Sequence, residues 1–138
     1  MSKPERIELH GVADPGELMA RVLAVRSREL GRLQGALQSG EGAGLHDFRI
    51  ACKRLRYALE RFEKVEPSLA PIAQSLSRLQ DALGAVHDRD VLASILPPAL
   101  EQAERKLHRE RTAFVEQAVA LWAQTKEKAR VCTLILFE

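Results

Sequence analysis

The chain has 138 residues, of which 46% are hydrophobic and only 4% aromatic, and its 21 Lys and Arg against 19 Asp and Glu leave a net charge of +2. This length is enough for one domain with a substantial core, while the small charge surplus excludes any argument for polyanion binding from net charge alone. Neither Cys52 nor Cys132 belongs to a metal-type or disulfide-type pattern, and no segment resembles a signal peptide or a membrane span, so we expect a cytoplasmic protein.

The first part of the chain predicts an arm followed by two helices. Residues 1–13 are polar and aperiodic, which indicates a flexible N-terminal arm. A helix start follows, with Asp14 as N-cap, Pro15 at the first helical position and Glu17 at the third, and this helix is expected to reach about Leu37. A glycine-rich connection over 38–44 then leads to a second helix, predicted at about 45–64.

The second part of the chain predicts two more helices. Aliphatic residues from Leu69 to Val86 recur in steps of three and four, with Gly84 interrupting the pattern near its end. Pro97 and its neighbouring proline break the chain before a long fourth helix, predicted at about 99–128. Residues 14–130 are therefore predicted to be all-α, as an antiparallel four-helix bundle. The apolar tail at 131–138 has a strand-like composition and either extends the last helix or docks on another subunit.

The second predicted helix carries cations along one side. At about 100° per residue, His46, Arg49, Lys53 and Arg56 form a continuous row beside the core-facing apolar residues, and we call these four residues the basic row. Guanidinium groups donate paired hydrogen bonds to phosphate oxygens, and lysine adds a point charge. The basic row therefore indicates a polyanion-binding surface. On periodicity alone, an equally good interpretation is that these charges keep a surface helix soluble.

Three other predicted helices place a polar or basic residue near their apolar faces. These residues are Arg26, Arg111 and, provided the third helix continues past Gly84, His87. Each one, taken singly, is better explained as a core-edge side chain that reaches water. Because isolated charges on inward faces are rare, the three together predict that the basic row forms one wall of a cleft or channel. Three further arginines on the outer flank of the first helix are interpreted as solvated surface: Arg21, Arg28 and Arg32.

Two segments carry a double motif: LHDFR at 45–49 with KRLRYALE at 53–60, and LQDALGAVHDRDV at 79–91. This double motif resembles the CHAD family, whose members are helical bundles that bind inorganic polyphosphate through basic residues. The resemblance implies a polyphosphate-binding protein. From the absence of catalytic and metal-binding motifs, we expect that it is not an enzyme and needs no cofactor or metal. Arg54 ranks below the basic row because its helical angle places it off that row. The complete set of predicted polyphosphate contacts is His46, Arg49, Lys53, Arg56, Arg54, Arg26, His87 and Arg111.

The resemblance also bears on assembly and location. Longer family members hold two related bundles in one chain, whereas this chain has length for one. A half-size member would restore the two-bundle arrangement as a homodimer, which is our hypothesis for the oligomeric state; the alternative is a reduced form that binds polyphosphate weakly. Polyphosphate granules in the cytoplasm are the location that the ligand implies, and no membrane partner is expected.

Three rival functions stay open as alternatives. A histidine phosphotransfer domain would use His46 as phospho-acceptor, but such domains resemble a pattern with glycine where this chain has Ile50. A helical metal phosphohydrolase would use His46, His87 and Asp88, yet it needs more ligands than the chain offers. Nucleic-acid binding fits the charges, but the basic row lacks interleaved aromatic residues for base stacking, and no recognised nucleic-acid motif is present. Nor does a phosphate loop or nucleophile elbow support enzymatic activity.

Overall fold

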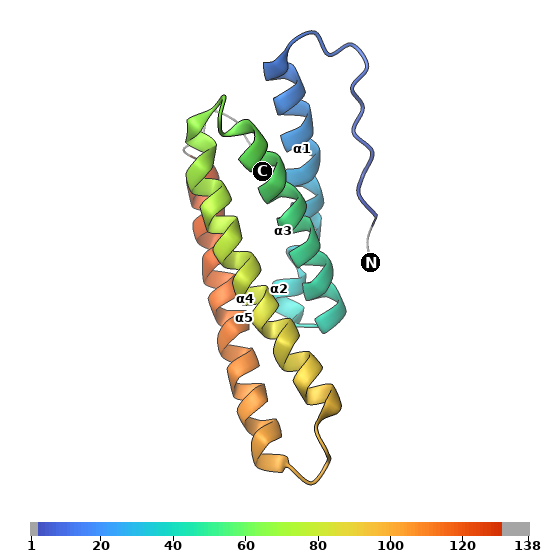
Figure 1. Ribbon diagram of the computed structural model, residues 1–138, viewed down its shortest axis with the longest axis vertical. Coiled ribbons are helices and arrows are strands. Elements are labelled where there is room, and N and C mark those ends of the chain that lie inside the picture. The colour runs from blue at the N-terminus through green and yellow to red at the C-terminus, as the bar shows by residue number, and fades with distance from the viewer. Residues whose placement is uncertain (1–2, 131–138) are drawn as a thin grey trace.

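The computed structural model describes residues 3–130, and these form a bundle of long helices (Figure 1). Consecutive long helices run in opposite directions, and no strand occurs within residues 3–130. The predicted all-α antiparallel four-helix bundle is therefore confirmed. The apolar tail at 131–138 lies outside the described residues. In chain order the elements are α1 (Pro15–Leu33), α2 (Ala36–Ser39), α3 (Gly42–Phe62), the 3₁₀ helix η1 (Pro67–Leu69), α4 (Ala70–Ile95) and α5 (Glu101–Arg130).

Local sequence signals set the start of α1. The Asp14 carboxylate accepts a hydrogen bond from the Glu17 N–H, and the Glu17 carboxylate accepts one from the Ala13 N–H. This reciprocal pairing satisfies backbone donors that the helix itself leaves unbonded, as the sequence predicts. The end of the predicted helix differs, because α1 stops at Leu33 and the chain turns through α2, which Gly40 caps with a positive φ of 67°.

The third predicted helix continues further than its aliphatic pattern. Gly84 lies inside α4 without interrupting it, and the helix ends at Ile95, just before the two prolines. The last turns of α4 and the first turns of α5 extend past α1 and α3 as a protruding hairpin (Figure 1). This hairpin end exposes large apolar side chains, namely Val91, Leu92, Ile95 and Leu100.

The core is aliphatic and centres on α3. Leu30, Leu55 and Leu76, one from each of three helices, are completely buried. The ring of Phe48 stands edge-on to that of Trp122, with 5.4 Å between ring centroids, so α5 is tied to the same core. α3 packs against α1 on one flank and against α4 on the other. The cations next to α3 therefore lie in two environments, one toward α4 and one toward α1.

Residues 3–14 contain no helix and run back alongside α1 (Figure 1). None of the described helices combines the length with the apolar composition that a membrane crossing requires.

Candidate polyanion-binding site

Arg49 lies across the backbone of α4. Its Nε donates a hydrogen bond to the Gln80 carbonyl oxygen at 3.4 Å. The guanidinium lies directly over Gly84, where a Cβ would make ordinary van der Waals contact with it, 3.5 Å from both the Nε and an Nη of Arg49. No carboxylate within residues 3–130 forms an ion pair with this guanidinium, whose hydrogen-bond acceptor is a carbonyl group. The flank of α3 that faces α4 thus holds a cation whose charge is not compensated.

The next turn of the basic row gathers around Tyr57, whose side chain is 47% exposed. The Lys53 Nζ lies 5.8 Å from the centre of that ring, and the Arg56 guanidinium lies 4.8 Å from it. Arg56 also pairs with Glu60 at 3.3 Å, but the Glu60 side chain is 43% exposed. Exposed ion pairs of this kind contribute at most about 1 kcal/mol. An incoming anion can therefore replace Glu60 at little cost.

Two histidines face each other across α3 and α4 at the start of the basic row. The rings of His46 and His87 are 5.5 Å apart between centroids, with an angle of 32° between their planes. Both residues line a small cavity together with Arg49 and Asp90. His46 is half-buried and His87 is exposed. The structure thus brings His87 to the basic row from a different helix.

Several buried polar atoms on this flank make no hydrogen bond within the described part of the chain. They are Nδ1 of His46, Nε of Arg56 and Oε1 of Gln80. Buried polar atoms without a partner are uncommon in folded proteins. This flank of α3 therefore has hydrogen-bonding capacity that the bundle itself does not use.

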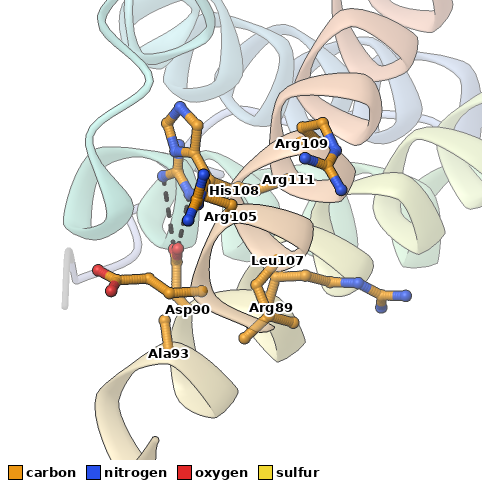
Figure 2. Close-up of a pocket in the computed structure, with 9 residues that line it drawn as sticks. Arg89, Asp90, Ala93, Arg105, Leu107, His108, Arg109 and Arg111 are labelled. Atoms are coloured by element: carbon orange, nitrogen blue, oxygen red, sulfur yellow. Dashed lines mark hydrogen bonds and ion pairs between the residues drawn. The ribbon is translucent and has the colours of Figure 1, made fainter. Parts of the chain in front are cut away.

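Arg111 reaches the same region from α5, but its charge is compensated. Its Nε donates to Asp90 at 2.6 Å, and one Nη donates to the Gly40 carbonyl oxygen at 2.6 Å. Figure 2 shows this guanidinium joined to the Asp90 carboxylate. Gly40 ends α2, directly before the turn that leads into α3. Arg111 thus fixes the beginning of the helix that carries His46, instead of offering a free cation.

Arg26 of α1 and Arg54 of α3 lie where these two helices meet, on the side of α3 away from the basic row. Both pair with Glu29: Arg26 through a short contact, and Arg54 at 3.8 Å. Glu29 itself is only 9% exposed. The expectation of one channel lined by Arg26 and the basic row is therefore corrected. The two arginines between α1 and α3 have a buried carboxylate as partner and do not converge on the basic row.

The arginines interpreted from sequence as solvated surface also have partners. Arg28 and Arg32 both pair with Glu5, at 3.0 and 3.1 Å. Arg21 pairs with Glu17 at 2.9 Å. Sequence periodicity cannot reveal the Glu5 contacts, because the arm that carries Glu5 has no period.

Cys52 lies in the core beneath the basic row and is completely buried. Burial raises the pKa of its thiol, and the nearby charge of Arg49 opposes this shift without cancelling it. The thiol is therefore neutral and does not act as a nucleophile. Within residues 3–130, no three side chains of the metal-binding types gather around a common point.

Comparison with known proteins gives one match. The family model for the CHAD domain matches residues 3–97, which include the arm, α1, α3 and α4 and both segments of the double motif. No curated protein and no solved structure matches the chain.

Proposed function

Because the chain belongs to the CHAD domain family, we propose that it binds inorganic polyphosphate through the basic row, without catalysing a reaction. CHAD domains are generally binding domains and are associated with polyphosphate. The observation that carries the proposal is the uncompensated charge of Arg49 and Lys53, neither of which pairs with a carboxylate in the described residues. A surface that only kept α3 soluble would not need these cations beside buried polar atoms that lack partners.

The spacing of the basic row suits a linear polyanion. From His46 to Arg56 the helix rises by about 15 Å, and a cationic or imidazole group recurs at each turn. Arg49 and Arg56 supply guanidinium groups for paired hydrogen bonds, and Lys53 supplies a point charge between them. His87 adds a second imidazole from α4. Of the eight predicted contacts, the proposal keeps these five as ligand contacts and gives Arg111 a positioning role.

The deciding experiment removes the charge of the basic row. In the full chain, the triple variant R49Q/K53Q/R56Q should bind long-chain polyphosphate about a hundredfold more weakly, since each contact contributes roughly 1 kcal/mol after screening. The matched control R105Q/K106Q/R109Q removes the same charge from exposed positions on α5 and should change affinity by less than about threefold. Equal losses in the two variants would show that net charge, and not the basic row, accounts for binding.

Salt dependence provides a second measurement of the same contacts. Polyanion binding weakens with salt because cationic side chains of the protein displace counterions that surround the polyanion. The slope of log affinity against log salt therefore reports the number of phosphate contacts. The R49Q/K53Q/R56Q variant should lower that slope by about 2, whereas the α5 control should leave it nearly unchanged.

The rival functions are separated by two controls. Duplex DNA at equal phosphate concentration should not displace bound polyphosphate, and displacement would favour general polyanion binding. After incubation with acetyl phosphate, the intact mass of the protein should stay the same. A gain of one phosphoryl group that is lost in His46→Gln would favour the phosphotransfer alternative.

We propose in addition that two copies associate as a homodimer in the cytoplasm, at polyphosphate granules where these are present. The exposed apolar side chains at the end of the hairpin between α4 and α5 support association. Light scattering at micromolar concentration should give twice the chain mass, with or without polyphosphate, and a monomer under both conditions would exclude the dimer.

A further inference from the structure

A second group of cations lies between α1 and α3, with three arginines on α1 and one on α3, and the N-terminal arm covers it. One carboxylate from the arm receives two arginines of α1: the Glu5 Oε1 accepts from Arg28 at 3.0 Å, and its Oε2 accepts from Arg32 at 3.1 Å. We call the whole group the arm cluster; it consists of Glu5, Arg26, Arg28, Glu29, Arg32 and Arg54.

The backbone of Glu5 is held as well as its side chain. Its N–H donates to the Glu29 carboxylate at 2.7 Å, and its carbonyl oxygen accepts from Arg26 at 3.3 Å. The contact with Arg28 lowers the pKa of the Glu5 carboxyl, so this carboxylate is charged at neutral pH. One residue of the arm thus makes four polar contacts with α1.

A pocket of about 230 Å³ opens beside Glu5, between the arm, α1 and α3. This volume is several times the roughly 30 Å³ that one water occupies in the liquid. Lys3, Arg32 and Arg54 bring three cations to its walls, against the carboxylates of Glu5 and Glu29. The arginines that hold Glu5 are accessible to a ligand, because the side chain of Arg28 is 49% exposed and that of Arg32 is 62% exposed.

We infer that the arm cluster is a second binding site for phosphate-bearing anions, and that Glu5 is its built-in occupant. Two guanidinium groups that converge on one carboxylate present the same donors that recognise a phosphate group. Without the Glu5 carboxylate, four arginines would face one carboxylate in place of two, so the net positive charge of the arm cluster increases by one. The Glu5 pairs are exposed and hence weak, which allows a more highly charged anion to displace them.

This inference does not depend on the basic row, which lies on the other flank of α3, and the test is built accordingly. All measurements use the full chain carrying R49Q/K53Q/R56Q, so that the permanent charges of the basic row are removed. The probe is inorganic tripolyphosphate at low ionic strength, followed by titration calorimetry. Adding Glu5→Gln to this background should raise the affinity about two- to fivefold, because the competing carboxylate is lost. Adding Arg28→Gln and Arg32→Gln as well should remove that gain.

The matched control is Glu8→Gln, which removes the same charge from the same arm. The Glu8 carboxylate accepts a hydrogen bond from the His10 N–H and does not contact the arm cluster. An effect of Glu5→Gln no larger than that of Glu8→Gln would overturn the inference, and so would a gain that persists without Arg28 and Arg32. Helicity by circular dichroism, compared among all variants, separates these outcomes from loss of the fold.

Discussion

Cations lie on both sides of α3, toward α4 and toward α1, but they have different partners on the two sides. Facing α4, Arg49 donates to a carbonyl group and Lys53 lies near an aromatic ring. Facing α1, both Arg26 and Arg54 pair with the buried Glu29. The difference shows that the partners of each cation, and not their number, decide whether a basic surface is available to a ligand.

The same difference predicts that substitutions on one flank lower the stability of the fold, whereas substitutions on the other lower the affinity for the ligand. Removing a cation from the α1 flank leaves a buried carboxylate without compensation, which costs folding free energy. Removing one from the basic row leaves no such carboxylate behind, so the loss should appear in ligand affinity instead. The following predictions test this separation, from the largest expected effect to the smallest.

The largest single effect should come from Arg26→Gln. The nearly buried Glu29 carboxylate would then keep only the longer ion pair with Arg54 and the hydrogen bond from the Glu5 N–H. We expect the free energy of unfolding to fall by about 2 kcal/mol, less than for a fully buried pair. Urea denaturation followed by circular dichroism measures this. Arg28→Gln, on the same helix but half-exposed, should cost less than about 0.5 kcal/mol.

A second substitution sharpens that result. Adding Glu29→Gln to Arg26→Gln removes the stranded charge and should recover more than half of the lost stability, because an uncompensated carboxylate is the main penalty. Purely additive losses from the two substitutions would show that packing, and not charge compensation, distinguishes the flanks.

The next prediction concerns ligand affinity, for which the flank that faces α4 should show the larger effect. Arg49→Gln alone should weaken polyphosphate binding about tenfold while leaving the melting temperature nearly unchanged, because no carboxylate loses a partner. Arg54→Gln should weaken binding by less than about twofold. Both are single Arg→Gln changes on α3, so they serve as each other's control. If Arg54→Gln weakens binding as much as Arg49→Gln, the two flanks do not differ in function.

Much of the fold follows from local signals that are visible in the sequence. The pairing of Asp14 with Glu17 and the break at Pro97 are short-range effects, and the structure contains both. The end of α1 at Leu33 is less predictable, because the aliphatic period continues to Leu37, which belongs to the separate helix α2. Periodicity records which face is buried and does not register a change of helix axis.

The candidate site was predictable only within one helix. Helical angles place Arg54 apart from the basic row, and the structure sets it against α1. The helical angles of one helix do not reveal partners that lie on other segments. Glu29, three residues after Arg26, is a detectable signal of pairing on α1, whereas Asp90 reaches Arg111 from α4, and Glu5 comes from an aperiodic arm.

A smaller effect concerns the space that Arg49 occupies on α4. A methyl group at Gly84 would make ordinary contact with the Arg49 guanidinium, at 3.5 Å, without displacing it. Gly84→Ala should therefore raise the free energy of unfolding by about 0.5 to 1 kcal/mol through helix propensity, with polyphosphate affinity unchanged. Gly84→Leu should instead push the guanidinium aside and lower affinity. Unaltered binding by Gly84→Leu would show that the position of Arg49 against α4 does not matter for the ligand.

The smallest effect distinguishes the flanks by pH. The arm cluster contains a carboxyl whose pKa is lowered below its ordinary value of 4.5, chiefly by its hydrogen bond to Arg28. A lowered pKa in the folded protein means that the charged form of Glu5 favours the docked arm. This contribution is complete above the ordinary pKa and is lost as the pH falls through the lower, folded value.

The arm should thus stay docked from neutral pH down past 4.5 and be released only below that value. Arg28→Gln should move the release upward, toward the ordinary carboxyl pKa. NMR titration of the Glu5 side chain measures both. If Glu5 titrates at the ordinary carboxyl value of 4.5 in the unmodified chain, Arg28 does not hold the arm, and the α1 flank would be as open to anions as the basic row.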